Sequence, residues 1–139
     1  MLDCMKKQVK VQDNYNVIQW AKKYGIVSRA FFMIGFPGET RETLEETKRF
    51  IEESDPDQYF VSNFVPYPGT DVYDNPGDYG ITNLSKDYDQ YFQVSKDGTG
   101  GLTIDTEWLT KEQFRDLELE FREWIKTRSM RGEKQNYES

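Results

Sequence analysis

Two short segments rich in glycine and proline carry the residues of this chain that could bind a ligand. The first, Phe32–Thr40, is an apolar run that ends at Gly35, turns through Pro37-Gly38 and continues with Glu39. A glycine at a strand end lets a planar or anionic group approach the main chain, and the amides that open a helix favour negative charge. Glu39 could accept a hydrogen bond from a hydroxyl or an ammonium group. The alternative is a tight strand-to-helix turn that needs its glycines, with Glu39 complementing the helix dipole.

The second segment is Phe64–Thr70, with the sequence FVPYPGT. Its prolines restrict the exit of a strand and leave carbonyl groups without a following amide partner. Those carbonyls, together with Tyr67, could hold an adenine or another flat ring. The alternative is a rigid loop with Tyr67 packed into the core. Neither segment fits the dinucleotide fingerprint G-x-G-x-x-G or a Walker sequence, so neither is specific by itself.

Composition excludes several other kinds of site. The 139 residues include 25 acidic and 18 basic side chains, for a net charge of −7, with no histidine and one cysteine. The lack of histidine excludes His-Asp triads and histidine metal sites, and Cys4 alone cannot form an intrachain disulfide, a zinc site or an iron–sulfur site. An acidic chain without a basic block is a poor candidate for nucleic-acid binding, and no apolar run approaches the roughly 20 residues of a membrane helix. We therefore expect a cytoplasmic, reduced protein or a piece of one, with no nucleic-acid or membrane partner. A scatter of aspartates is interpreted as a solvated loop rather than a calcium site: Asp71, Asp74, Asp78, Asp87 and Asp89.

The elements that must position the two segments alternate between helix and strand. Asp13 can cap a helix that runs to Tyr24, and the near-continuous apolar run Ile26–Ile34 is typical of a parallel strand covered on both faces. Thr40 caps a second helix that runs to about Ser54, and Tyr59–Val65 is a second strand. Because a strand–helix–strand crossover is nearly always parallel and right-handed, both turns should lie at one edge of the sheet, where α/β folds bind ligands. The apolar face of the first helix is predicted at Val17, Ile18, Trp20, Ala21 and Tyr24.

The second half of the chain is predicted to be rich in loops until a long helix near its end. Short strands are plausible around Tyr91–Ser95 and Leu102–Asp105. Thr110 can open the last helix over residues 110–130 through a capping box with Gln113. One stripe of that helix is apolar and is interpreted as core or interface: Phe114, Leu117, Phe121, Trp124 and Ile125.

The two segments at this separation resemble the second half of the radical S-adenosylmethionine enzymes, in the branch with an N-terminal cobalamin-binding domain that includes oxidative cyclases. The resemblance extends roughly over residues 2–128 and also includes Leu2–Lys7, Asp87–Asp89 and Leu109–Glu112. It implies a partial TIM-type (β/α)6 barrel. Residues 1–70 would then be the C-terminal part of that barrel, with two parallel strands and their helices. Residues 71–131 would be an extension ending in the amphipathic helix, and residues 132–139 a flexible tail.

The resemblance also implies roles for the two turns. The first would follow the fifth barrel strand near the adenosyl group of S-adenosylmethionine, and the second would end the sixth strand and border adenine through its backbone, with Tyr67 on the substrate side. The literal family pattern G-x-I-x-G-x-x-E is not met, because Phe31 stands in place of its first glycine and Glu39 comes one residue late. The residues implied to bind the cofactor are Gly35, Phe36, Pro37, Gly38, Glu39, Val65 and Pro66.

The family's cluster-binding motif C-x-x-x-C-x-x-C does not occur in this sequence. We therefore expect a fragment of a radical S-adenosylmethionine oxidoreductase or methyltransferase, inactive alone. Its parent would use S-adenosylmethionine and a 4Fe–4S cluster, with cobalamin as a further candidate, and none of these is expected on the fragment. Its partners would be the N-terminal remainder of the same polypeptide and a small-molecule substrate, and its exposed strand edges predict self-association. Two alternatives stay open: an acidic, non-catalytic interaction module that docks through the aromatic last helix, and a complete small nucleotide-binding protein.

Overall fold

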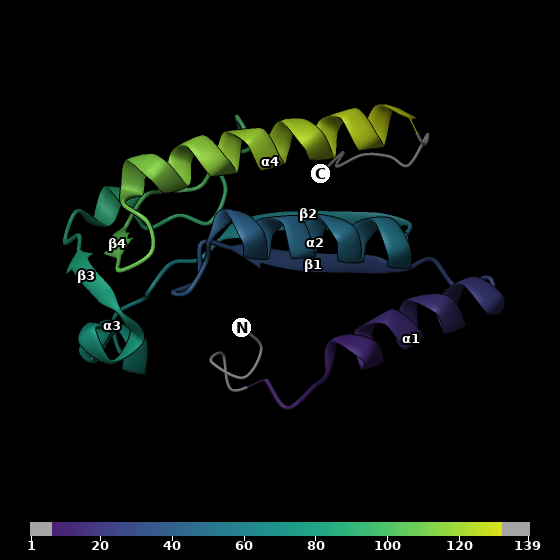
Figure 1. Cartoon of the computed structure of the whole chain (residues 1–139), viewed down its shortest axis with the longest axis horizontal. Helices are drawn as coiled ribbons and strands as arrows, with labels where there is room; N and C mark the ends of the chain where they lie inside the picture. Colours follow the sequence, from purple (N-terminus) through teal and green to yellow (C-terminus); the bar gives the residue numbers. More distant parts are fainter. Residues whose placement is uncertain (1–6, 132–139) are drawn as a thin grey trace.

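A computed structural model describes residues 7–131 of the chain. Helices and strands alternate in the first half, and short elements precede a long last helix in the second half (Figure 1). In chain order the elements are α1 (Val11–Lys23), β1 (Arg29–Ile34), α2 (Arg41–Ser54), β2 (Gln58–Asn63), α3 (Asp71–Asp74), η1 (Pro76–Tyr79), β3 (Ile81–Leu84), η2 (Tyr88–Gln90), β4 (Ile104–Thr106) and α4 (Lys111–Arg131).

The two strands β1 and β2 pair in parallel, in register from Arg29 opposite Gln58 to Ile34 opposite Asn63. The predicted parallel crossover through α2 is therefore confirmed. Thr40 opens α2 as predicted: its hydroxyl accepts from the Thr43 amide at 3.3 Å, and the Thr43 hydroxyl accepts from the Thr40 amide at 2.9 Å. These reciprocal bonds satisfy amides that a helix start would otherwise leave unpaired.

One face of the β1–β2 sheet carries the main core. Ile34 and Val61 project from the strands, and α2 and α4 both pack against them. Figure 1 shows α4 extending alongside the sheet and α2, with β3 and β4 near one end. The predicted apolar stripe of α4 is confirmed as core, and it buries Leu117 and Phe121 completely or nearly so. The predicted parts 1–70 and 71–131 thus share one core, while their division into separate units stays a prediction.

The opposite face of the sheet is open in the part of the chain that the structure describes. Phe31 is 72% exposed and Met33 is 41% exposed, while the Phe60 ring lies 5.8 Å from that of Phe31. The prediction of a strand covered on both faces is therefore wrong for Phe31 and Met33, which the other residues of the range 7–131 leave exposed. The strand also begins at Arg29, later than predicted, and the preceding Ile26 and Val27 are exposed.

The first helix lies against α2 by its C-terminal half. It begins at Val11, before the predicted cap, and Asp13 accepts the Lys10 amide at 3.0 Å from inside the first turn. Gln19 donates to the Ser54 carbonyl at 2.9 Å, which joins the helix to the end of α2. Its predicted apolar face is mostly wrong, because Ile18 is buried but three of the other members are exposed: Val17, Trp20 and Tyr24.

The second half contains an antiparallel pair, β3 with β4. The strand predicted around Tyr91–Ser95 is wrong, since this segment is irregular and the Tyr91 hydroxyl donates to the Ser85 carbonyl at 2.7 Å. The strand predicted at Leu102–Asp105 overlaps β4, whereas β3 was not predicted because only four residues form it. The predicted capping box of α4 is confirmed: Thr110 and Gln113 each bond the backbone amide of the other, at 2.9 and 3.2 Å. Among residues 7–131, the helices fall short of the length and apolar character that crossing a membrane requires.

Candidate functional site

The two glycine- and proline-rich turns lie next to each other at the carboxyl ends of β1 and β2. The Phe64 amide donates to the Ile34 carbonyl at 2.8 Å, which extends the pairing of the strands by one bond. The Phe36 and Phe64 rings then meet edge to face, with centroids 4.8 Å apart. The prediction that both turns share one edge of the sheet is confirmed.

The two glycines of the first turn have different surroundings. Gly35 has a φ of +79°, and a Cβ built on it would lie 2.6 Å from Cζ of Phe114 on α4. Gly38 has a φ of +98°, and a Cβ built there meets nothing within 4 Å. The space beside Gly35 is therefore filled by the protein itself, whereas the backbone at Gly38 stays approachable from outside.

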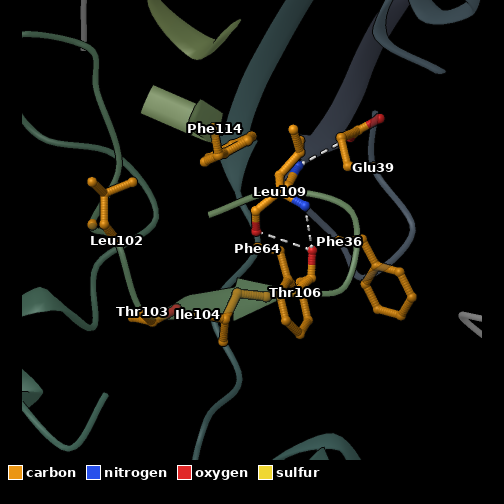
Figure 2. Close-up of a pocket in the computed structure, with 11 residues that line it drawn as sticks. Phe36, Glu39, Phe64, Leu102, Thr103, Ile104, Thr106, Leu109 and Phe114 are labelled. Carbon is orange, nitrogen blue, oxygen red and sulfur yellow. Dashed lines mark hydrogen bonds between the residues drawn. The ribbon is translucent and has the colours of Figure 1, made fainter. Parts of the chain in front are cut away.

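Glu39 is buried, with 4% of its surface exposed. One carboxylate oxygen accepts from the Gly35 amide at 3.0 Å, and the other accepts from the Thr43 hydroxyl. Burial raises the pKa of Glu39, and the hydrogen bonds from Thr43 and Gly35 partly oppose that rise. Glu39 thus ties the turn to the first residues of α2, a role that neither sequence interpretation included, and Figure 2 shows its bond to the turn.

The second turn buries two of its predicted site residues and exposes the third. Val65 and Pro66 are buried, with 6% and less than 2% of their surface exposed. Tyr67 is 43% exposed, so the interpretation of Tyr67 as a core residue is wrong. The carbonyl of Val65 accepts from the Tyr67 amide at 3.1 Å, and that of Tyr67 accepts from the Thr70 hydroxyl at 2.7 Å. These two carbonyls already have partners within the loop.

A small pocket lies between the two turns and the β4 segment (Figure 2). Its volume of about 20 Å³ suits a water molecule and is far too small for a nucleoside. The Thr103 hydroxyl is buried in this region without a hydrogen-bond partner among the described residues. The pocket is lined by Gly35, Phe36, Glu39, Phe64, Gly101, Leu102, Thr103, Ile104, Thr106, Leu109 and Phe114.

A buried ionic network, not predicted from the sequence, anchors α4 to the end of β2. Glu118 is fully buried and accepts from Arg115 at 2.5 Å, from Arg122 at 2.9 Å and from the Gly100 amide at 2.9 Å. Arg122 also donates to the Asn63 side chain at 2.9 Å. The sequence signal is a glutamate inside the apolar stripe of a helix, with arginines three residues before and four residues after it.

The described residues contain no group of three histidine, cysteine, aspartate or glutamate side chains that could hold a metal ion. This holds for the aspartates of the second half as well, and their assignment to a solvated loop stays a prediction. Cys4 lies outside the described residues. Residues 7–131 accordingly offer no ligand set for an iron–sulfur cluster.

Comparison with known proteins finds similar sequences over part of the chain. The anaerobic magnesium-protoporphyrin IX monomethyl ester cyclase of Rubrivivax gelatinosus is 36% identical over 77 residues, which cover 55% of this chain and 14% of the relative. An uncharacterized methyltransferase of Pyrococcus horikoshii is 35% identical over 83 residues, covering 60% of this chain and 17% of the relative. The tRNA-2-methylthio-N(6)-dimethylallyladenosine synthase of a Sulfurihydrogenibium species is 33% identical over 101 residues, covering 71% of this chain and 23% of the relative.

These alignments each span less than a quarter of the relative's own length, between 14 and 23%. No family model matches the chain, and no solved structure does.

Proposed function

From the similarity of this chain to members of the radical S-adenosylmethionine family, which confirms the resemblance predicted from its two turns, we propose that it contributes one wall of the S-adenosylmethionine site in such an enzyme. The observation that carries the proposal is the placement of both family-like turns on the carboxyl ends of adjacent parallel strands. That edge is where ligands bind in barrels of this class.

The geometry assigns different parts in that wall to the predicted residues. The backbone at Gly38 offers the approach, since nothing fills the space beside it. The buried Phe36, Pro37, Val65 and Pro66 give the wall a rigid apolar backing, and Glu39 holds the Gly35 amide. Exposed Tyr67 lies on the substrate side. S-adenosylmethionine, bound with an iron–sulfur cluster, supplies radical chemistry that protein side chains lack, and the protein positions and shields it.

Other parts of the proposed enzyme come from outside this chain. The described residues offer no cluster ligands, so the cluster and any cobalamin would be bound by an N-terminal remainder of the same polypeptide. The open sheet face at Phe31 and Met33 is the surface which that remainder would cover. We propose that the chain alone is inactive, that it associates with itself through its free strand edges, and that its parent acts in the cytoplasm on a small molecule.

The wall is tested in the longer polypeptide, anaerobically, by equilibrium dialysis with S-adenosylmethionine. Gly38→Leu should weaken binding at least tenfold, because the new side chain enters the approach to the backbone. Gly25→Leu is the matched control: Gly25 also has a positive φ, of +68°, with open space around it, but it lies at the opposite end of β1. If Gly38→Leu and Gly25→Leu bind S-adenosylmethionine with equal affinity, the first turn is not part of the S-adenosylmethionine site. Cleavage of S-adenosylmethionine by the 139-residue chain alone would refute its inactivity.

Two structural observations bear on the alternatives and favour the proposed site over them. An interaction module would need the aromatic face of α4, but Phe121 and its neighbours on that face pack into the chain's own core. A complete nucleotide-binding protein would need a larger cavity than the pocket between the turns, so that pocket by itself does not support this alternative. Titration of the isolated chain with a nucleotide tests the latter, and tight binding would restore it.

A further inference from the structure

A connected row of tyrosines lies on the second half of the chain, beginning where β2 ends. We call Tyr67, Tyr73, Tyr88, Tyr91 and Lys86 the tyrosine surface. The centroids of Tyr67 and Tyr91 are 6.5 Å apart, those of Tyr91 and Tyr88 are 5.0 Å apart, and the hydroxyls of Tyr88 and Tyr73 are 2.7 Å apart. Tyr88 is 57% exposed and Tyr67 is 43% exposed, so at least these two rings of the row face solvent.

Lys86 adds a positive charge to this surface. Its ammonium nitrogen lies 3.9 Å from the centroid of the Tyr73 ring, a cation–π contact. The ion pairs formed within residues 7–131 do not include Lys86, although Asp87 follows it directly in the chain. A hydrogen bond with the Tyr73 phenol raises the pKa of Lys86, so the side chain stays cationic at neutral pH. The charge is therefore available to an anion.

We propose that the tyrosine surface binds a flat, conjugated ring that carries an anionic group, with the ring on the exposed tyrosines and the anion at the Lys86 ammonium. Tyrosine rings stack on flat ring systems without selecting one ring over another. The chain carries a net charge of −7, and the Lys86 ammonium supplies a local positive charge that complements such a ligand.

The position of this surface next to the second turn makes it the substrate side of the proposed enzyme, and only that assignment rests on the proposed function. Binding itself needs neither S-adenosylmethionine nor a cluster. If the tyrosine surface binds no ring, the proposed S-adenosylmethionine site at Gly38 can still be correct. If Gly38 does not contribute to S-adenosylmethionine binding, the tyrosine surface can still bind a ring.

The probe is flavin mononucleotide, whose fluorescence falls when its ring stacks on tyrosine, and riboflavin is its counterpart without the phosphate. We expect saturable quenching of flavin mononucleotide by the 139-residue chain, and about tenfold weaker binding of riboflavin, because one charge pair near a protein surface has that order of effect. Lys86→Gln should abolish the difference between the two flavins. The matched control Lys96→Gln removes the same charge from an exposed lysine outside the surface and should keep the difference.

The stacking part is tested with Tyr88→Ala, which should weaken both flavins by about three- to tenfold. Tyr24→Ala, at an exposed tyrosine beyond the end of α1, should change neither affinity. Far-ultraviolet circular dichroism shows whether each variant keeps its helices. Equal affinities of the two flavins for the unmodified chain, equal effects of the two lysine variants, or no saturation up to about 1 mM would each overturn the proposal.

Discussion

Replacing Gly35 by alanine tests whether this glycine is required by packing against α4. A residue at a φ of +79° pays about 1–2 kcal/mol relative to glycine, and alanine recovers about 0.4–1 kcal/mol of that by restricting the unfolded chain. The new Cβ would also lie 2.6 Å from the Phe114 ring, and relieving such overpacking costs about 1–3 kcal/mol. We expect Gly35→Ala to lower the free energy of unfolding by about 2–4 kcal/mol.

Gly25 separates the two contributions, because it has a φ of +68° and open space where a Cβ would be. Gly25→Ala should cost about 1 kcal/mol or less, which measures the backbone contribution alone. The remainder of the Gly35→Ala effect belongs to the clash. In the background Phe114→Leu, which shortens the opposing side chain, Gly35→Ala should therefore cost clearly less than in the unmodified chain.

The assay is urea unfolding at pH 7, followed by circular dichroism. With a slope of about 1–3 kcal/mol per molar urea, the expected loss lowers the midpoint by roughly 1–2 M. If Gly35→Ala costs no more than Gly25→Ala, or costs the same with Phe114→Leu as without it, the contact with Phe114 does not explain the glycine.

Three further predictions concern buried or hydrogen-bonded carboxylates. Glu118→Ala removes the buried carboxylate that pairs with Arg115 and Arg122, and it should lower the free energy of unfolding in urea by about 3–5 kcal/mol. The control Glu123→Ala, on the exposed side of α4, should change it by no more than about 0.5 kcal/mol. Similar losses for the two variants would contradict the ionic network. Burial raises the pKa of Glu39 above its ordinary value of 4.5, so its favourable contribution to stability is complete below that pH and is lost as pH rises. The free energy of unfolding of Glu39→Gln, relative to that of the unmodified chain, should therefore be higher at pH 7 than at pH 4. The same difference between the two chains at both pH values would refute this. Hydrogen bonds from Ser95 and Thr99 lower the pKa of Asp97 from 3.8 to about 2, so its contribution to stability is present above pH 3.8 and is lost as pH falls toward 2. Carbon-detected NMR titration of the Asp97 carboxyl group measures its pKa. A titration midpoint near 3.8 would contradict the prediction.

Local patterns in the sequence were enough to predict the elements that carry the candidate site. Thr40 and Thr110 mark the starts of α2 and α4 because capping depends on residues within one turn of each other. The parallel pairing followed from a strand–helix–strand order that has one common solution, and it placed the two turns together. The similarity to radical S-adenosylmethionine enzymes was likewise visible in these two turns, and the sequence comparisons bear it out.

The contacts that hold the site together depend on residues far apart in the chain, and only the tertiary structure decided them. The sequence shows a glycine at position 35 but not the Phe114 ring that fills the space beside it. Glu118 sits in an apolar stripe, yet its partner Arg122 reaches Asn63 only because α4 packs along β2. An apolar run in the sequence does not show which of its faces will be buried, because burial depends on the elements that pack there. Phe31 is one example, since the other described residues leave its side chain exposed. The sequence by itself thus determined the elements and the edge where their turns meet. Packing of α4 against the sheet decided which side of that edge is filled by the protein and which is open to a ligand.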